Sequence, residues 1–229
     1  MTSKLFNFSA VTAAVFLLAS SLIPNTSYCQ YPGWQQKVNY EIDVTLDTSL
    51  HQYSGEMKVR YYNNSPENLN KVFWYAFFNA FQPGSMMDVR SRNISDPDSR
   101  VGDRIFSLPE DEWGWIKDVE LSMNGEPCVV TIEETIIVAE LPTSISSGNY
   151  ADFNMTWKAQ VPRQIRRSGW MNKEGIEYSM TQWYPKLCEY DHEGWHSHPY
   201  VGREFHGVWG DYDVSIHLPS GYFVAGTGQ

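Results

Sequence analysis

The chain has 229 residues, of which 42% are hydrophobic and 15% aromatic, and its formal net charge is −10. That length supports one large β domain or two small ones, and the richness in aromatic residues excludes a disordered tail. The negative charge argues against nucleic-acid binding, because a phosphate backbone is bound by a basic surface that releases counterions.

Residues 1–29 have the pattern of a signal peptide. Lys4 is the only charged residue among them, and an apolar run follows over residues 10–23. This run is too short to cross a bilayer comfortably and matches a secretory signal core; a retained membrane anchor is the alternative. We expect cleavage before Gln30, which leaves residues 30–229 with a charge of 16 − 27 = −11. The mature chain is then expected outside the cytoplasm, as a secreted, periplasmic or cell-surface protein that makes no membrane contact.

Two cysteines, Cys128 and Cys188, follow the predicted signal peptide. Outside the cytoplasm such a pair can form a disulfide. A disulfide requires the two Cα atoms to lie close together, and the sequence does not provide that distance. A disulfide and two free thiols therefore both stay open as predictions.

Residues 40–47 and 56–61 alternate between apolar and polar side chains. This period of two predicts an antiparallel strand pair with one solvent-exposed face, joined through a turn at residues 49–54. The run over residues 72–78 is apolar on both faces and predicts a central strand. A polar insertion follows over residues 88–111, which we interpret as a surface excursion.

Further short strands follow this insertion, and no window after the predicted signal peptide has a convincing helical stripe. Asn124-Gly125 predicts a hairpin turn. The later extended segments are residues 116–123, 129–132, 135–141, 153–161, 212–218 and 222–225. Eight or more short strands joined by turns predict an all-β fold, either an antiparallel β-sandwich or a large curved, saddle-like sheet.

Standard catalytic signatures are missing from the chain. It has no HExxH motif for zinc, no GxSxG nucleophile motif and no glycine-rich phosphate loop. His196 and His198 would face the same side of an extended strand and could both reach one metal ion, with His192 and His206 nearby. We favour the alternative, an irregular loop whose histidines are solvated or hydrogen-bonded, so no catalytic or metal-binding residue is predicted.

Four tryptophans lie in the same region and allow two interpretations. Exposed indole rings could form a platform on which sugars stack, whereas large aromatic residues in a β protein are more often part of the core. The core interpretation is favoured. The four residues are Trp170, Trp183, Trp195 and Trp209.

Three blocks of the sequence resemble the amino-terminal domain of the aminopeptidase N family of gluzincin metallopeptidases. Residues 40–61 resemble its first two strands, and residues 180–186 (MTQWYPK) resemble a segment that reaches into the active site. Residues 210–228 resemble the strand pair that follows. The likeness covers roughly residues 36–229 and is weakest in the polar insertion.

The resemblance implies that catalysis and capping of the active-site cleft belong to two different domains. In that family a downstream catalytic domain holds one zinc ion through HExxH and a later glutamate, and the amino-terminal domain caps the cleft. Gln182 matches the family's glutamine that helps to seat the peptide's amino terminus. Tyr184 stands where an acidic residue is often found, so recognition of the substrate ammonium would fall to the catalytic domain, to Glu177 or to Glu189.

We therefore expect the chain to be the amino-terminal capping domain of an exported zinc metallo-aminopeptidase. Gln182 and Tyr184 are its predicted substrate-binding residues, and peptide is its predicted partner through the catalytic domain. Zinc is expected in the full-length protein, and the sheet is expected to be incomplete at its carboxyl end. Residues 30–229 alone should be inactive. The alternatives are a secreted β-sandwich that binds glycans or protein, and a purely structural or adhesive sandwich.

Overall fold

The computed structural model describes residues 33–94, 98–202 and 205–228. The predicted signal peptide, residues 1–29, lies outside the described residues. The chain divides into two units between Gly33 and Trp34, and the fold below is that of the second unit. Among the described residues, none of the helices has the length and apolar character needed to span a bilayer.

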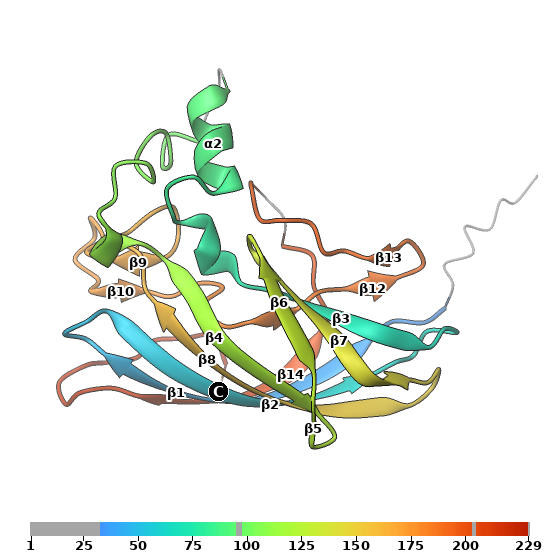
Figure 1. The fold of residues 1–229 in the computed structure, drawn as a ribbon. Coiled ribbons are helices and arrows are strands. Elements are labelled where there is room, and N and C mark those ends of the chain that lie inside the picture. The colour runs from blue at the N-terminus through green and yellow to red at the C-terminus, as the bar shows by residue number, and fades with distance from the viewer. Residues whose placement is uncertain (1–32, 95–97, 203–204, 229) are drawn as a thin grey trace, which may run out of the picture. The chain divides into compact units, whose positions relative to one another are not determined.

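The larger sheet has six strands in the order β14-β1-β2-β8-β4-β5 (Figure 1). Neighbouring strands are antiparallel except for β1 and β14, which run parallel. In chain order the strands are β1 (Lys37–Asp47), β2 (Gln52–Tyr62), β4 (Trp115–Met123), β5 (Glu126–Pro127), β8 (Tyr150–Gln160) and β14 (Gly210–His217).

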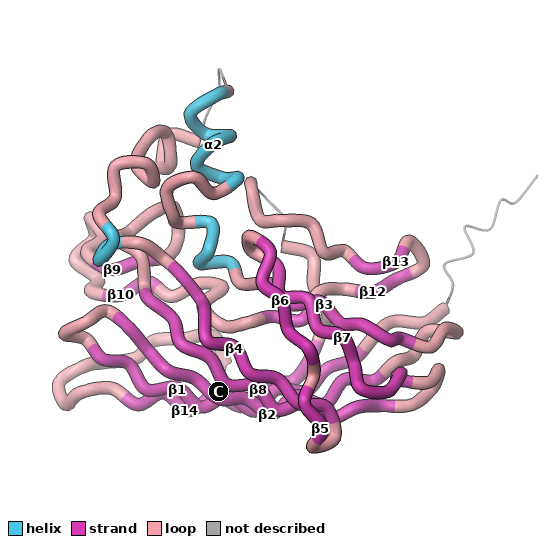
Figure 2. The backbone as a smooth tube through the Cα atoms, in the orientation of Figure 1, coloured by secondary structure: helices cyan, strands magenta, loops and turns pink. Residues whose placement is uncertain are grey.

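A second, antiparallel sheet has four strands in the order β11-β3-β7-β6, and the described residues also form two short hairpins. Among the described residues, helix is confined to three short segments, η1 (Phe77–Ala80), α2 (Met86–Asn93) and η2 (Glu110–Glu112), coloured cyan in Figure 2. The strands of this sheet are β3 (Leu69–Tyr75), β6 (Val129–Glu133), β7 (Ile136–Ile145) and β11 (Lys186–Leu187). In one hairpin β9 (Gly169–Trp170) pairs with β10 (Tyr178–Ser179), and in the other β12 (Tyr190–Asp191) pairs with β13 (Gly194–Trp195).

The core lies between the two sheets, and it follows the predicted alternation. Every second residue of β1, β2 and β8 is buried, as the period of two requires. Trp74 of β3 meets Phe153 of β8 edge to face, with ring centroids 5.8 Å apart. Figure 1 shows β3, β6 and β7 layered against the larger sheet. The all-β, sandwich-like prediction is confirmed.

Both predicted hairpin turns are present. At the β1–β2 turn, the Asp47 carboxylate accepts hydrogen bonds from the Ser49 N–H at 2.9 Å, the Ser49 hydroxyl at 2.6 Å and the Leu50 N–H at 3.3 Å. At the β4–β5 turn, Asn124 and Gly125 have φ angles of 52° and 88°. Two consecutive positive φ values are the geometry that an Asn-Gly pair favours.

Two predictions around residue 80 were wrong in part. The apolar run 72–78 does not continue as a strand, because β3 ends at Tyr75 and the short helix η1 follows. The polar insertion 88–111 is not only a surface excursion, since it includes part of helix α2 and buries Val101 and Ile105.

A capping arrangement explains helix α2. The Ser85 hydroxyl accepts the Asp88 N–H at 3.2 Å, and the fully buried Asp88 carboxylate accepts the Gly84 N–H at 2.8 Å. Arg92 pairs with the same carboxylate at 2.9 Å and 3.0 Å. Ser85-Met-Met-Asp88 is thus a variant of the capping-box pattern, and it was the sequence signal for this helix.

The strand pairing at the carboxyl end differs from the strand pair expected over residues 210–228. β14 pairs in parallel with β1, matching Tyr40 to Tyr212, and no strand forms over residues 222–225. Tyr212, Val214 and Ile216 continue the apolar face of β1 but are 41–42% exposed.

Gly55 of β2 faces the buried indole of Trp157 on β8. A Cβ atom added at Gly55 would lie 2.2 Å from Trp157 Cζ2, so the ring would have to move. We predict that Gly55→Ala lowers the free energy of unfolding by about 1–3 kcal/mol in a urea titration, the cost typical of overpacking. Gly226→Ala is the matched control, because a Cβ there meets no atom within 4 Å. Equal stability of the two variants would contradict this packing.

Candidate functional site

Three segments distant in sequence come together at one end of the larger sheet. Tyr178 of β10 contacts the β1–β2 turn: its hydroxyl lies 2.6 Å from His51 Nδ1 and donates to the Thr48 carbonyl at 3.3 Å. The Tyr222 hydroxyl donates to Glu177 Oε1 at 2.6 Å. We call residues 177–184, together with the β1–β2 turn and Tyr222, the rim.

Gln182, the predicted substrate-binding residue, lies on the rim with a strained backbone. Its φ is 56°, in the left-handed region that non-glycine residues rarely adopt. The side chain is half-buried, and within the described part of the chain its amide makes no hydrogen bond. Residues with a strained backbone are enriched at ligand-binding sites, and seven described non-glycine residues of this chain, Gln182 among them, have a positive φ.

Anchors on both sides hold Gln182 in this conformation. The Ser168 hydroxyl donates to the Thr181 carbonyl at 2.6 Å and accepts the Thr181 N–H at 3.2 Å. On the other side the Tyr53 hydroxyl donates to the Trp183 carbonyl. These contacts fix the backbone on both sides of Gln182.

Tyr184 is packed into a cluster of aromatic rings. Its ring lies 5.8 Å from that of Tyr40 and 6.0 Å from that of Tyr212, and both contacts are edge to face. Burial raises the pKa of Tyr184 well above its usual range, and Tyr212 adds to this rise. The phenol is therefore neutral, and this placement makes Tyr184 an anchor of the rim segment.

The two candidate acids differ in accessibility. Glu177 is exposed on the rim and hydrogen-bonded by Tyr222. Glu189 is only 4% exposed. Burial raises the pKa of Glu189 to about 7, and the nearby Asp191 carboxylate adds to the rise. Of the two, only Glu177 is placed to meet a ligand at the rim.

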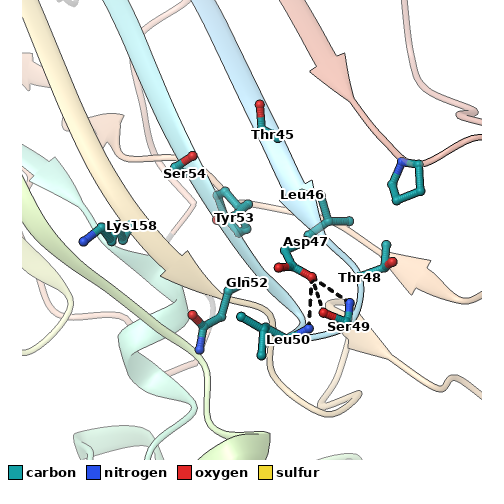
Figure 3. Close-up of a pocket in the computed structure, with 11 residues that line it drawn as sticks. Thr45, Leu46, Asp47, Thr48, Ser49, Leu50, Gln52, Tyr53, Ser54 and Lys158 are labelled. Carbon is teal, nitrogen blue, oxygen red and sulfur yellow. Dashed lines mark hydrogen bonds between the residues drawn. The ribbon is translucent and has the colours of Figure 1, made fainter.

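A hollow of about 660 Å³ lies beside the β1–β2 turn (Figure 3). Its charged groups are Asp47 and Lys158, and Gln182 and Tyr184 do not line it. Hydrogen bonds from the Ser49 hydroxyl and N–H lower the pKa of Asp47, and Figure 3 shows these bonds inside the turn. The Asp47 carboxylate thus stabilises the turn, and the hollow does not contain the predicted site.

The histidine-rich region is organised around an aspartate that sequence reasoning missed. His196 Nε2 lies 2.8 Å from Asp191 Oδ2, and His206 Nε2 lies 3.9 Å from the same oxygen. The His196 and His198 rings, the pair suggested by sequence, have centroids 6.5 Å apart. The available signal was Asp191 itself, three residues before Gly194, the glycine of a tight hairpin turn.

The four tryptophans are covered to different degrees. Trp170 stacks on His51 at 4.1 Å, and Trp195 packs against Phe73 at 5.4 Å. Trp183 is half-buried, whereas Trp209 is 77% exposed. Only Trp209 of these four presents most of its ring to solvent.

The two cysteines are free thiols, so the possible disulfide does not form. Cys188 is fully buried next to β3, where its N–H donates to the Phe73 carbonyl at 2.8 Å. Cys128 is half-buried, and burial raises the pKa of its thiol. Both thiols are therefore protonated and poor nucleophiles.

A scan against protein-family models and a search of curated proteins each find no match to the chain. Among solved structures, the M1 zinc metallopeptidase from Deinococcus radiodurans is similar at 13% identity and a TM-score of 0.38, covering 65% of this chain and 26% of that one. A mutant M1 zinc metallopeptidase from the same organism, bound to a Tyr-Ser-Ala substrate, matches at 13% identity and a TM-score of 0.37, with the same coverage of both chains.

A two-domain M1 zinc metallopeptidase mutant bound to L-tryptophan is similar at 14% identity and a TM-score of 0.37, covering 65% of this chain and 27% of that one. The chain thus spans 26–27% of the length of these metallopeptidases. The likeness is too distant to assign residues or activity.

Replacing Gln182 by glycine tests the strain at this position. The left-handed backbone costs about 1–2 kcal/mol for a non-glycine residue, and the greater freedom of unfolded glycine offsets about 0.5–1 kcal/mol of the relief. We predict that Gln182→Gly raises the free energy of unfolding by ~0.5–1 kcal/mol, while Gln182→Ala gives no gain.

Met171→Gly is the matched control, because Met171 is exposed and has a φ of 60°. It should gain stability to a similar extent. A loss of stability in Gln182→Gly would show that the side chain contributes packing and would contradict its role as a presented group.

Proposed function

We propose that this chain is the amino-terminal capping domain of an exported zinc metallo-aminopeptidase, and that its rim seats the free amino terminus of a peptide substrate. The observation that carries the proposal is Gln182, which is strained, unpaired and held between two anchors. This residue falls in the MTQWYPK segment, the block that resembles the substrate-contacting part of that domain.

The chemistry of an amide suits this task. Its oxygen can accept a hydrogen bond from a substrate ammonium, and its NH₂ group can donate to a peptide carbonyl. Because Thr181 and Trp183 are fixed by side chains from other segments, little conformational entropy is lost when Gln182 engages a ligand. Pre-organised groups of this kind position a substrate for reaction.

Glu177 is the rim's candidate for charge recognition. It replaces the acidic residue that the resemblance leads one to expect at the position of Tyr184, whose buried and neutral phenol cannot balance an ammonium charge. The Tyr222 hydroxyl donates to the Glu177 carboxylate and orients it. The exposed position leaves the second carboxylate oxygen open to a ligand.

Zinc chemistry would come from a further domain, since the sequence contains no HExxH motif. A zinc ion bound there would polarise the scissile carbonyl and activate water. The rim of this chain would bind and orient the peptide. We accordingly propose that residues 30–229 by themselves do not hydrolyse aminoacyl-anilides.

A second function is favoured by one observation, the 77% exposure of Trp209. An open indole face next to an all-β scaffold can stack on a sugar ring. In this alternative the chain is a secreted glycan-binding sandwich. Binding on a glycan array that disappears in Trp209→Ala and persists in Gln182→Ala would favour it over the peptidase proposal.

The decisive experiment reads the full coding sequence, including any region that follows Gln229, and assays the protein that it encodes. We expect an HExxH motif in that region and zinc-dependent hydrolysis of aminoacyl-anilides. In that protein Gln182→Ala should lower kcat/KM about tenfold, mainly through KM, since a hydrogen bond to a charged group contributes about 1.5–3 kcal/mol.

Gln35→Ala is the matched control, because Gln35 is an exposed glutamine outside the rim. It should leave kcat and KM unchanged. An unchanged KM in Gln182→Ala would remove Gln182 from the substrate site, and a coding sequence without a zinc motif would overturn the peptidase proposal itself.

A further inference from the structure

The β12–β13 hairpin places acidic and imidazole groups on one face. Asp191 pairs with Gly194, and the His196 N–H donates to the Glu189 carbonyl at 2.9 Å, which extends the ladder by one pair. Side chains alternate between the two faces of a hairpin. Glu189, Asp191 and His196 therefore share one face, with Asp191 and His196 at diagonal positions of the hairpin.

A third group reaches this face from residues 205–209, the segment that leads into β14. The His196 and His206 rings lie 4.6 Å apart with their planes at 79°. One ligand atom from each of Asp191, His196 and His206 lies within 4.8 Å of the other two. Three side chains from two separate segments thus converge on one point.

These spacings fit the coordination sphere of a transition-metal ion. Ligand atoms about 2.0–2.1 Å from a tetrahedral zinc ion are about 3.3 Å from one another. The two distances to Asp191 Oδ2, 2.8 Å from His196 Nε2 and 3.9 Å from His206 Nε2, lie on either side of that value. All three ligand atoms lie within 4.8 Å of one another, so side-chain movements of an ångström or so would be needed to bring each pair to about 3.3 Å.

The surroundings support a ligand role for these atoms. His196 Nε2 is buried, and despite its 2.8 Å approach to Asp191 it lacks a hydrogen bond of good geometry among the described residues. The Glu193 N–H donates to Asp191 Oδ1 at 2.8 Å, which orients the carboxylate and leaves Oδ2 toward the histidines. The Tyr75 hydroxyl donates to the His196 carbonyl at 2.5 Å and fixes its backbone.

We propose that Asp191 Oδ2, His196 Nε2 and His206 Nε2 bind a divalent transition-metal ion, with zinc as the preferred metal. Two imidazoles and one carboxylate are ligands that zinc accepts, and a fourth position stays open for water. Calcium and magnesium are disfavoured, because they take oxygen ligands. The bound ion would tie residues 205–209 to the β12–β13 hairpin and so fasten the segment that enters β14. This inference does not depend on the peptidase proposal.

The test is zinc binding to the purified chain, measured by calorimetry and by the visible spectrum of the cobalt(II) form. We expect one ion per chain and a tetrahedral cobalt spectrum. His206→Ala and Asp191→Asn should each weaken zinc binding about tenfold or more, the loss expected for disturbing a metal site. At the same zinc concentration, the Tm of the unmodified chain should rise more than that of His206→Ala.

His217→Ala is the matched control. His217 Nε2 lies 2.9 Å from Asp43 Oδ2, so it forms a similar histidine–aspartate pair, and no third potential ligand joins it among the described residues. It should retain full zinc binding. His206 has a side chain that is 59% exposed, so its replacement should leave the fold intact, as circular dichroism would verify.

Two results would overturn the proposal. One is zinc binding no tighter than millimolar in the unmodified chain, which would leave the three residues as a simple ion-paired cluster. The other is binding that His206→Ala and Asp191→Asn leave unchanged, which would place the metal elsewhere.

Discussion

Tyr40 is the residue on which the geometry of the rim depends. From the first half of β1 its ring stacks on Tyr212 of β14 at 4.7 Å and meets Tyr184 edge to face. Its hydroxyl accepts the Leu187 N–H at 3.0 Å, so β11 is attached to the same side chain. Burial raises the pKa of Tyr40 well above its usual range, which keeps the hydroxyl neutral. One buried phenol thus joins two strands of the larger sheet to the segment that carries Gln182.

This attachment explains why the rim can hold a strained residue. The conformation of Gln182 is unfavourable by itself, and the chain adopts it because Thr181 and Trp183 are bound to Ser168 and Tyr53. Strain of this kind persists only where the surrounding contacts are stronger than its cost. The aromatic cluster and the two hydrogen-bonded anchors supply those contacts, and they leave the amide of Gln182 available to a ligand.

The β12–β13 hairpin has two faces with different tasks. On one face Tyr190 and Trp195 pack against the core, with Trp34 stacked on Tyr190 at 6.0 Å and Tyr61 stacked on Trp195 at 6.3 Å. The other face carries Asp191 and His196. Because the aromatic face holds the hairpin rigidly to the sheet, the polar face can be pre-organised for a metal ion. Rigid support of this kind is what a binding site of defined geometry requires.

The sequence by itself determined the local features of this protein. The alternation in residues 40–47 and 153–161 identified the buried face of β1 and β8, because side-chain direction in a strand repeats every two residues. Asn124-Gly125 identified its turn, because both residues tolerate a positive φ. Gln182 was predicted as a substrate-binding residue because its segment, residues 180–186, resembles a segment of the aminopeptidase N family. Each of these signals is contained within a few neighbouring residues.

The tertiary structure decided what depends on partners distant in the chain. The parallel pairing of β14 with β1 joins residues more than 150 positions apart, and alternation does not specify which neighbour a strand takes. From sequence alone, Asp88 would be placed at the surface. In the structure it is buried, because Gly84 and Arg92 donate hydrogen bonds to its carboxylate and its N–H donates to Ser85. Asp191 meets His206 only because a hairpin and a separate segment converge. Burial and convergence are properties of the packed chain, so a local sequence pattern does not contain them.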